Sequence, residues 1–561
     1  MISTKKHVQQ LAFLLQAKGI TDVVICPGSR NGPLIHTLAL SNHFNCRSIV
    51  DERSAAYFAI GLSQASKKPV VVVCSSGTAA LNFAPAVAEA FHLNIPLVII
   101  TADRPDYWIN QGENQTINQQ NIYHNYCKKG ISLPLGESEE ELWYAARLLN
   151  EIINFSTTGL PGPVHINVPL EEPLHDLLDE PLRPVKVIHA LSGRLTFPVP
   201  NADELIETFN RYNKIIILPG QMPPDPLLAK VLVKLSLKTG AVVLKEHLSN
   251  LTHSSFAGNI DLLVTSLLSE NTGEFSPDLL ITFGGTFVSK SLKQFLRTNK
   301  PAEHWHLCTS EQYYDTYQSL THIIHTTAIE FLQQLSVKAL QKENDYAKRW
   351  INKELHVKRV RDEFINQSEF SDLSVFNKIC KAIPKNSVVH LGNSSPVRYA
   401  LLCDPANGTE YYSNRGTSGI DGSLSTAVGF ASVSQKLNIV ILGDLSFFYD
   451  SNALWNNYIG KNLRIIVIHN GGGNIFSMIK GPAESQAFDQ FFYTKNSTSA
   501  KGIASTFGLE YLQATNEREL QQALSAFYTI NHNRAVLLEI FTNAEINAQK
   551  FRALFKTIKE I

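Results

Sequence analysis

Short runs of apolar residues alternate with longer stretches of mixed polarity over the first 180 positions. Runs this short, apolar at almost every position, are typical of strands buried on both faces of a parallel sheet. They occupy residues 22–26, 69–74, 96–101 and 164–168. Helical patterns lie at 8–15, where Ser3 or Thr4 is expected to cap the helix, and at 78–92. The alternation predicts a parallel α/β domain at residues 1–180.

The same alternation returns twice further along the chain. A polar stretch with several prolines, 171–200, is typical of a linker. Apolar runs follow at 214–218, 241–244 and 278–283 and, after a charged helix-forming run at 338–364, at 387–391, 438–442, 464–468 and 535–541. We therefore expect an α/β protein of three doubly wound parallel-sheet domains, at residues 1–180, 200–345 and 365–561. The length of 561 residues agrees, because one core rarely exceeds about 300 residues.

The composition argues against several classes of protein. Lys+Arg and Asp+Glu both number 50, so no overall field favours nucleic acid or an acidic membrane. The seven cysteines are scattered without a CxxC pair, which argues against a disulfide framework and a zinc site. No apolar run is long enough to span a membrane or to form a secretory signal. A cytoplasmic protein with no nucleic-acid partner and no membrane span is expected.

Two successive strand ends in the last domain carry oxygen ligands. Gly443 and Asp444 follow one apolar run, and Asn470 follows the next, with three glycines behind it. A carboxylate, an amide oxygen and glycine carbonyls suit a Mg²⁺ ion that keeps waters and takes its other ligands from a diphosphate. Either half alone is more often a simple turn or loop. Together they favour a metal site and resemble the diphosphate-binding motif of thiamine diphosphate (ThDP) enzymes.

A further acid stands where a short strand gives way to a helix. Glu52 lies in the segment DERSA, residues 51–55. The common role of such a residue is to stabilise the helix start through the macrodipole. A ThDP enzyme also needs a carboxylate that hydrogen-bonds N1′ of the aminopyrimidine, so that the cofactor can deprotonate its thiazolium ring. Glu52 is the candidate for that catalytic role.

Four arginines lie just past predicted strand ends. They are Arg30 in CPGSR, Arg104 in TADRP, Arg398 in GNSSPVR and Arg415 in SNRGTSGIDG. Any one of them alone would be interpreted as a solvated surface residue. Ligands of open α/β sheets bind at the carboxyl ends of strands, and the guanidinium fork matches a carboxylate. Four such arginines in a protein without net charge predict a pocket for several carboxylates.

The motifs together point to one family. CPGSR, DERSA, TADRP, GENQ, GNS…R, SNRGTSGIDG, GDLS and NGGGNIF occur in this order along the chain. They closely resemble those of the 2-succinyl-5-enolpyruvyl-6-hydroxy-3-cyclohexene-1-carboxylate synthase family, the ThDP enzymes of menaquinone biosynthesis. The resemblance implies pyrimidine-binding, central and diphosphate-binding domains in that order. It also implies a homodimer, or a dimer of dimers, with ThDP between the first domain of one subunit and the third domain of its partner.

The resemblance also implies roles for individual residues. Glu52 would be catalytic, and Asp444, Asn470 and the Gly472 carbonyl would hold Mg²⁺ or Mn²⁺. The expected cofactor-binding residues are Glu52, Ile420, Gly443, Asp444, Asn470 and Gly472. The expected substrate-binding residues are Ser29, Arg30, Arg104, Gln115, Lys290, Asn393, Ser394, Arg398, Arg415, Ile475, Phe476 and Ile479. One departure is that Ser291 stands where relatives often have an arginine after the lysine.

The implied activity is that of a transferase: decarboxylation of 2-oxoglutarate and 1,4-addition of the succinyl unit to isochorismate. One alternative is another ThDP enzyme, such as a 2-oxoacid decarboxylase or acetohydroxyacid synthase. A wholly apolar pocket with few arginines would favour that alternative, and this chain shows the reverse. Another is a non-catalytic subunit with the ThDP fold. Such a subunit could lose the activating carboxylate, whereas Glu52, Asp444 and Asn470 are all present.

Overall fold

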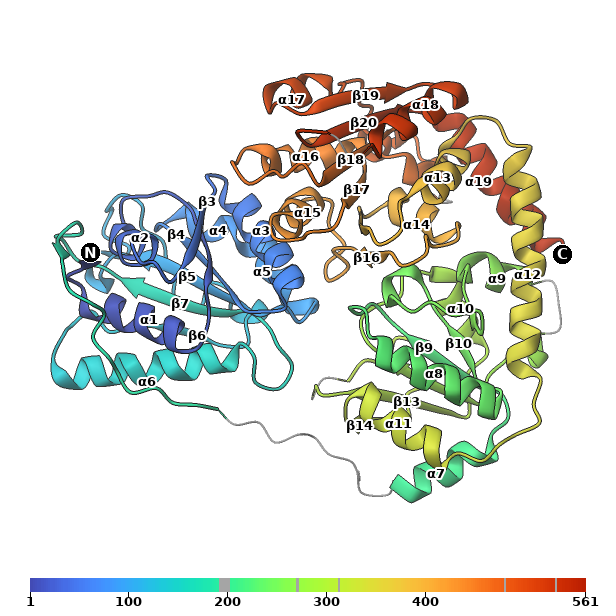
Figure 1. The fold of residues 1–561 in the computed structure, drawn as a ribbon, viewed down its shortest axis with the longest axis horizontal. Coiled ribbons are helices and arrows are strands. Elements are labelled where there is room, and N and C mark those ends of the chain that lie inside the picture. Colours follow the sequence, from blue (N-terminus) through green and yellow to red (C-terminus); the bar gives the residue numbers. More distant parts are fainter. Residues whose placement is uncertain (191–201, 269–271, 311–312, 479–480, 530–531) are drawn as a thin grey trace.

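The computed structural model describes residues 1–190, 202–268, 272–310, 313–478, 481–529 and 532–561. Three six-stranded sheets follow one another along the chain, and the strands within each are all parallel (Figure 1). Apolar side chains pack on both faces of each sheet. This confirms the prediction of three doubly wound α/β units.

The first sheet has the order β3-β2-β4-β5-β7-β6. In that order its strands are Asn45–Ser48, Asp22–Ile25, Val70–Cys74, Leu97–Asp103, Val164–Pro169 and Gly130–Ser132. One face packs on α1 (Lys6–Ala17), α2 (Gly32–Ala39) and α6 (Glu139–Phe155). The other packs on α3 (Glu52–Ser66), α4 (Thr78–Asn82) and α5 (Ala84–His92). The predicted helix 78–92 is thus two helices, because Pro85 lies in the first turn of α5.

The start of the chain differs from expectation. Ser3 and Thr4 do not cap α1, whose N-cap is Lys5 without a side-chain hydrogen bond. Ser3 belongs instead to β1 (Ile2–Ser3), which pairs antiparallel with β8 (Leu177–Leu178). The N–H of Thr4 continues this contact by donating to the carbonyl of Asp176. In the first turn of α1, the N–H of Lys6 donates to Oε1 of Glu137 (2.8 Å), so a distant side chain takes the place of the expected local cap.

The central sheet has the order β11-β10-β9-β12-β13-β14. In that order its strands are Phe256–Ala257, Val242–Leu244, Ile215–Pro219, Leu279–Phe283, Glu303–Cys308 and His322–His325. Its helices are α7 (Ala202–Arg211), α8 (Pro226–Thr239), α9 (Ile260–Ser266), α10 (Lys290–Thr298) and α11 (Ala328–Lys338). This order is that of a dinucleotide-type doubly wound sheet and differs from that of the first sheet.

The third sheet has the order β16-β15-β17-β18-β20-β19. In that order its strands are Glu410–Tyr412, Val388–Leu391, Asn438–Gly443, Leu463–His469, Val536–Phe541 and Glu510–Ala514. Its helices are α13 (Asp372–Ala382), α14 (Ser395–Leu401), α15 (Ser423–Ala431), α16 (Asp444–Tyr449), α17 (Lys501–Thr506), α18 (Glu517–Phe527) and α19 (Ala544–Lys559). The first and third sheets have the same succession of strands, in line with the strand–turn–helix pattern that their sequences share.

Helices α3 and α15 bring the first and third domains together (Figure 1). A Cβ on Gly61 would lie 1.9 Å from the carbonyl oxygen of Thr426, and one on Gly429 would lie 2.0 Å from that of Phe58. No side chain fits at either position, so the two backbones touch. This close packing sets how the first domain meets the third.

A single long helix, α12 (Tyr346–Asn366), links the central and third domains. The predicted helix at 338–364 is wrong at its start, because α11 ends at Lys338 and α12 begins eight residues later. Between the two helices, a backbone N–H forms a hydrogen bond outside the local segment. The N–H of Lys342 donates to the carbonyl of Lys238 at the end of α8 (3.0 Å). Tertiary contacts therefore compete with the local helical preference of this charged run.

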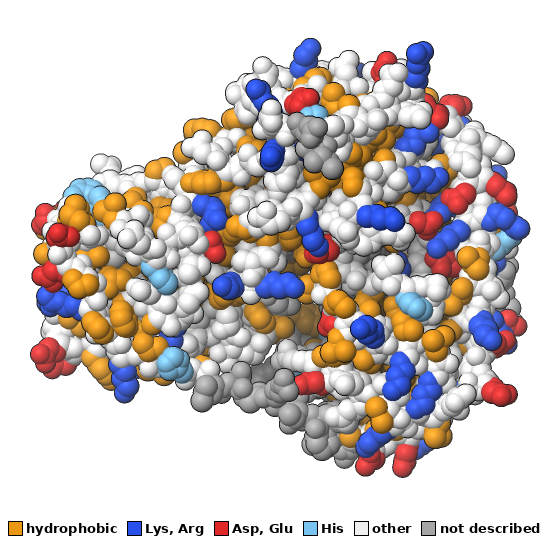
Figure 2. Space-filling model, viewed as in Figure 1, with side chains coloured by type: hydrophobic (Ala, Val, Ile, Leu, Met, Phe, Trp, Pro, Cys, Tyr) orange, Lys and Arg blue, Asp and Glu red, His pale blue; other side chains and the backbone are white. Residues whose placement is uncertain are grey.

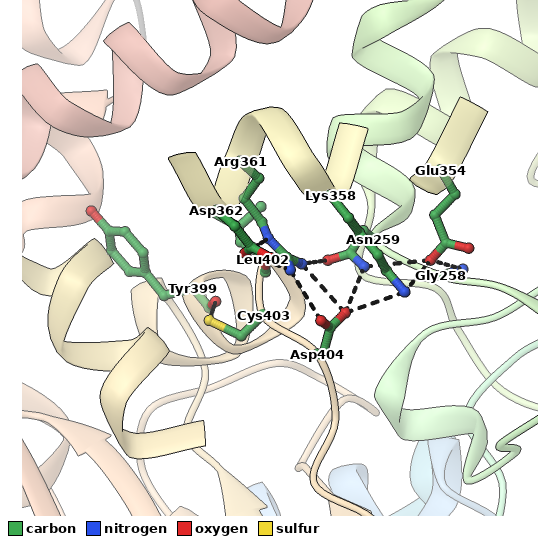
Figure 3. A network of polar contacts seen from close by, with 10 residues as sticks. All are labelled: Gly258, Asn259, Glu354, Lys358, Arg361, Asp362, Tyr399, Leu402, Cys403 and Asp404. Atoms are coloured by element: carbon green, nitrogen blue, oxygen red, sulfur yellow. Dashed lines mark hydrogen bonds and ion pairs between the residues drawn. The ribbon is translucent and has the colours of Figure 1, made fainter. Parts of the chain in front are cut away.

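A polar network on α12 ties this helix to both neighbouring domains (Figure 3). Arg361, 2% exposed, donates to Oδ1 of Asn259 in the central domain (2.7 Å) and to Oδ2 of Asp404 in the third domain (3.0 Å). Glu354 accepts the N–H of Gly258 (2.9 Å). We call Asn259, Glu354, Arg361 and Asp404 the α12 joint.

Replacing Arg361 with Ala is expected to weaken this joint. The substitution leaves Asn259 without its charged donor and Asp404 with Lys358 as its remaining cation (3.3 Å). Breaking a buried pair costs about 3–5 kcal/mol. Because the Asp404 side chain is 52% exposed, we expect a loss near the lower figure. Chemical denaturation measures it, with Arg359→Ala on the exposed side of the same helix as the control. Equal losses in the two variants would contradict a stabilising role for the joint.

The loss should depend on pH. Burial alone raises the pKa of Asp404, but Arg361 and Lys358 hold it well below its usual range. The stabilisation is therefore complete above the unfolded pKa, about 3.9, and is lost as pH falls below it. The stability difference between the native chain and Arg361→Ala should shrink below about pH 4.

The surface agrees with the balanced composition. Acidic and basic side chains are interspersed over the face shown in Figure 2. Among the helices that the structure describes, none is long and apolar enough to cross a membrane.

Candidate active site

The carboxyl ends of three neighbouring strands of the third sheet form the candidate site. β15, β17 and β18 lie side by side, and the direction in which strands are added reverses between β15 and β17. Such a switch point leaves a crevice at the carboxyl ends, where open α/β sheets bind ligands. Gly443 at the end of β17 pairs with Ile468 of β18. Asp444 and Asn470 therefore emerge at nearly the same level of the sheet.

Asp444 begins α16 and is 1% exposed. Its Oδ1 accepts the N–H of Leu445 (2.9 Å), and its Oδ2 accepts Nδ2 of Asn496 (3.2 Å). Burial raises the pKa of this carboxyl, against the effect of these donors. Nε2 of His469 lies 4.0 Å from Oδ2, beyond hydrogen-bond distance. A bound cation would stabilise this buried carboxylate further.

Asn470 follows β18 and is 3% exposed. Its Nδ2 donates to Oδ2 of Asp372 (2.9 Å), and its backbone carbonyl accepts the hydroxyl of Tyr493 (2.9 Å). In the described part of the chain, no hydrogen bond is made to its Oδ1. The carboxamide therefore presents an oxygen that is free to ligate a cation.

The glycines after Asn470 pack against the segment 492–496. Gly472 has φ +144°, and a Cβ there would lie 2.5 Å from the carbonyl oxygen of Tyr493. A Cβ on Gly473 would lie 2.7 Å from the carbonyl oxygen of Phe492. Only glycine is accommodated at these two positions. The close approach fixes the course of the backbone that carries the Gly472 carbonyl.

Another amide lies unpartnered beside the glycines. Asn474 is 1% exposed, and both its Oδ1 and its Nδ2 are buried without a hydrogen-bond partner among the residues that the structure describes. Buried polar groups are normally paired. The unpaired amide therefore fits a site that a polar ligand, such as a diphosphate with its cation, would complete. Sequence analysis did not single out Asn474, although the NGGGNIF motif contains it.

The donor set suits a hard cation. Among the described residues, no group of three or more His, Cys, Asp and Glu could hold a metal. A metal at this edge would depend on Asp444, on Oδ1 of Asn470 and on the Gly472 carbonyl, with waters and phosphate oxygens completing its shell. Mg²⁺ is commonly bound in this way, by a few protein oxygens together with phosphate oxygens and water.

Arg415 and Arg398 lie past the ends of β16 and β15. Nη1 of Arg415 donates to Oδ1 of Asn393 (2.7 Å), whereas its Nε is buried with no partner in the described part of the chain. Nη1 of Arg398 donates to the carbonyl of Ser394. Burial lowers the pKa of both guanidinium groups, and the charge of Arg398 lowers that of Arg415 further. Two partly buried cations with unused donors could bind an anionic group.

All three domains hold the loop 413–422, which carries Arg415. Asn393 donates both amide hydrogens to carbonyls of this loop (2.7 Å each). Glu89, which is fully buried in the first domain, accepts two N–H groups of the loop. Gln221 of the central domain donates to a third carbonyl of the loop (2.8 Å). Glu89 and Gln221 lie far from the loop in sequence, so no local motif could have indicated them.

Helix α10 of the central domain carries two lysines, and the second lies close enough to Arg415 for their charges to interact. Lys290, the first residue of the helix, is exposed, and Lys293 is half-buried one turn later. Burial lowers the pKa of Lys293, Glu246 opposes this shift, and Arg415 adds to it. Sequence analysis missed Lys293. Its signal was the spacing of three residues from Lys290, which places both on one helical face.

Arg30 and Arg104 form a second pair, in the first domain. Arg30 is 7% exposed, and its Nη2 lies 3.2 Å from Oε1 of Glu172. Nη2 of Arg104 lies 3.2 Å from Oε1 of Glu113. Burial lowers the pKa of Arg30, and the charge of Arg104 lowers it further. Among described residues of this one chain, no hydrogen bond or ion pair joins this pair to the third-domain pair.

Ser29 and Gln115 are exposed on loops of the first domain. Gln115 has φ +55°, and its backbone lies against Gly77. Gln119, which sequence analysis did not consider, holds this loop. Its Oε1 accepts the N–H of Gly77 (2.8 Å), and its Nε2 donates to the carbonyl of Ala102 (3.0 Å).

Glu52 is the first residue of α3 and is half-buried. The cap of α3 is Asp51, whose Oδ1 accepts the N–H of Ser54 (3.0 Å) and whose Oδ2 accepts Nδ2 of Asn452 (2.7 Å). Within the described part of the chain, no hydrogen bond or ion pair engages the side chain of Glu52. Because Asp51 caps the helix, the carboxylate of Glu52 is available to a ligand.

Partly buried apolar residues flank the edge. The carbonyl of Ile420 accepts the hydroxyl of Ser446 (2.9 Å). Ile475 and Phe476 lie on the short 3₁₀ segment Asn474–Met478, and the ring of Phe476 lies 5.7 Å from that of Phe492. Ile479 lies outside the described residues. An open pocket of about 1030 Å³ extends from Asn470 along the first half of α19.

Three family models match successive parts of the chain. The "Thiamine pyrophosphate enzyme, N-terminal TPP binding domain" matches residues 5–122. The "Middle domain of thiamine pyrophosphate" matches 199–391. The "Thiamine pyrophosphate enzyme, C-terminal TPP binding domain" matches 392–540, the part that contains Asp444 and Asn470.

Curated relatives match over the whole length. A 2-succinyl-5-enolpyruvyl-6-hydroxy-3-cyclohexene-1-carboxylate synthase of Bacteroides thetaiotaomicron is 42% identical, with 100% of both chains covered. Proteins of the same name from Phocaeicola vulgatus and Flavobacterium psychrophilum are 41% and 40% identical. The former match covers 100% of this chain and 99% of the relative, and the latter covers 98% of each.

Proposed function

We propose that this chain, which belongs to the 2-succinyl-5-enolpyruvyl-6-hydroxy-3-cyclohexene-1-carboxylate synthase family of thiamine diphosphate enzymes, decarboxylates 2-oxoglutarate and adds the succinyl unit to isochorismate. The reaction would need Mg²⁺ or Mn²⁺ and would serve menaquinone biosynthesis in the cytoplasm. Residues 1–180, 200–345 and 365–561 are assigned as the pyrimidine-binding, central and diphosphate-binding domains.

One observation carries the proposal. The same edge of the third sheet carries two buried oxygen donors suited to a cation, Asp444 and Asn470, and two partly buried arginines, Arg398 and Arg415. A diphosphate with its cation and an acidic substrate would therefore meet at neighbouring strand ends. A decarboxylase of apolar 2-oxoacids has no need of the arginines.

When bound, ThDP supplies the electron sink for loss of CO₂. Asp444, Oδ1 of Asn470 and the Gly472 carbonyl would hold the cation that binds the diphosphate. Arg398 and Arg415 would bind carboxylates of 2-oxoglutarate. Ile420 would support the cofactor, and Ile475 and Phe476 would form an apolar wall that excludes water, a role also proposed for Ile479, which lies outside the described residues. Gly443 would leave room for the diphosphate, since the space beside its Cα is open: a Cβ there meets no atom within 4 Å. Ser394 and Asn393 position the two arginines.

The first domain would contribute the remaining groups. Glu52 would hydrogen-bond the aminopyrimidine, and Arg30, Arg104, Ser29 and Gln115 would bind isochorismate, with Lys290 of the central domain. In one chain, Glu52 makes no described contact with Asp444 or Asn470, and the two arginine pairs do not touch. We therefore propose a homodimer, or a dimer of dimers, in which two chains complete each site. Sedimentation velocity tests this, and a monomer that is active would contradict it.

A direct experiment tests the function. The protein is incubated with ThDP, Mg²⁺, 2-oxoglutarate and isochorismate, and the product is identified by mass spectrometry. The expected product carries the isochorismate ring plus a succinyl unit and forms only when all four components are present. Succinic semialdehyde as the sole product, with isochorismate unconsumed, would indicate a simple decarboxylase and contradict the proposal.

Replacing Ser291 with Arg tests which substrate the central domain binds. The substitution restores the Lys-Arg pair common among relatives, at the second residue of α10. It is expected to lower the KM for isochorismate up to about fivefold, since a solvated ion pair contributes at most about 1 kcal/mol. The KM for 2-oxoglutarate should stay unchanged. Steady-state kinetics with Ser291→Gln as the uncharged control decide this, and a selective change in the 2-oxoglutarate KM would reverse the assignment.

A further inference from the structure

Asp372 is a buried acid beside the candidate cation site that no motif of the chain contains. It is the first residue of α13 and has no exposed surface. Its Oδ2 accepts Nδ2 of Asn470 (2.9 Å), and its Oδ1 accepts the hydroxyl of Thr542 at the end of β20 (2.6 Å). Its own N–H donates to Oδ1 of Asn547 on α19 (2.8 Å). Three elements therefore fix the carboxylate in one orientation.

The side-chain amide of asparagine has two chemically different ends. Only the oxygen can ligate a cation, and a rotation of 180° would turn the NH₂ group toward the cation instead. An ionised carboxylate accepts hydrogen bonds and donates none. Because Asp372 contacts Nδ2, the NH₂ end of Asn470 must face Asp372 and Oδ1 must face away. No other described contact of the Asn470 side chain fixes this choice.

We infer that Asp372 is a positioning residue of the proposed cofactor site: it holds the carboxamide of Asn470 with the oxygen toward the divalent cation. The inference rests on the proposed cation site and adds a residue to it. Outer partners of this kind orient metal ligands, and their removal typically weakens metal affinity about 10–100-fold. Asp372 itself need not touch the cation or the diphosphate.

The alternative role is purely structural, since a carboxylate at the first turn also stabilises a helix start. Ser374 provides a matched control for that role. Its Oγ accepts the N–H of Ser371 (3.0 Å) at the same end of α13, and it makes no contact with Asn470. Ser374→Ala should lower the thermal midpoint and leave cation affinity unchanged.

The test measures Mn²⁺ binding in the presence of ThDP by electron paramagnetic resonance, which needs no turnover. Asp372→Ala is expected to weaken Mn²⁺ affinity at least about tenfold. The exchange variant Asp372→Asn/Asn470→Asp keeps the total charge and places a symmetric carboxylate at the ligand position, which needs no orienting partner. It should bind Mn²⁺ within about threefold of the native chain and so keeps the test valid if Asp372→Ala folds poorly.

The outcomes separate the two proposals. If the native chain binds no Mn²⁺ with ThDP, the proposed cation site itself fails. If the native chain binds and Asp372→Ala binds equally well, or if the folded exchange variant loses affinity as Asp372→Ala does, Asp372 acts only on the helix and the inference is overturned.

Discussion

Glu52→Gln is expected to abolish turnover while ThDP still binds within about tenfold of its native affinity. Glutamine keeps the shape and hydrogen-bonding ability of the side chain but cannot offer a carboxylate to the aminopyrimidine. Loss of one hydrogen bond to a charged group costs about 1.5–3 kcal/mol at most, which limits the effect on binding. Loss of the activating carboxylate removes the first step of the reaction for every bound cofactor.

Asp51→Asn is the matched control for this prediction. Asp51 is the neighbouring acid, and asparagine at an N-cap accepts the same N–H of Ser54. This variant should keep activity within about threefold, since it changes a nearby charge and preserves the cap. Rapid-mixing kinetics and calorimetric ThDP titration measure both variants. Near-native activity in Glu52→Gln would remove Glu52 from the reaction.

Most strands could be predicted because each is a short apolar run buried on both faces. The run 438–442 became β17 with one more residue, and 464–468 became β18 with one more at each end. The relative positions of Asp444 and Asn470 also follow, since both stand at carboxyl ends of neighbouring parallel strands. The spacing of apolar residues and the position of a strand end depend on neighbouring residues, so both can be predicted from the sequence.

Other contacts depend on parts of the chain that meet only in the fold. Ser3 pairs with Leu177, so a cap expected from its neighbours did not form. Asp372 acts on Asn470 through the placement of α13 beside β18, and no spacing in the sequence encodes that placement. Glu89 likewise reaches the loop of Arg415 from another domain. Sequence reasoning identifies groups that a ligand would touch more readily than the groups that orient them.

The prediction that all four arginines share a pocket shows the same limit. The strand end that precedes each arginine could be predicted from the sequence. Which of these ends face one another depends on how domains and subunits pack. Within one chain, the charge of Arg398 lowers the pKa of Arg415, and the charge of Arg104 lowers the pKa of Arg30. The meeting of the two pairs stays a prediction that requires the second subunit.

Asp444→Ala is expected to lose both Mg²⁺ and ThDP. The proposed cation has one protein carboxylate, and the remaining ligands, an amide oxygen of Asn470 and the Gly472 carbonyl, are neutral. Without Asp444 they are too weak to hold a divalent cation, and the diphosphate loses the cation through which it would bind at this strand end. Calorimetric titration with ThDP in the presence of Mg²⁺ should show no measurable binding, and the native chain in EDTA should behave alike.

Asp489→Ala distinguishes coordination from a general charge effect. Asp489 is an exposed acid that lines the pocket beside Asn470, and no described hydrogen bond or ion pair joins it to Asp444 or Asn470. Its removal should leave ThDP affinity within about twofold, because an exposed charge contributes little through solvent. If Asp489→Ala loses ThDP as completely as Asp444→Ala, the effect of Asp444 is not coordination. Unchanged ThDP affinity in Asp444→Ala would contradict the assignment of Asp444 as a ligand of the cation.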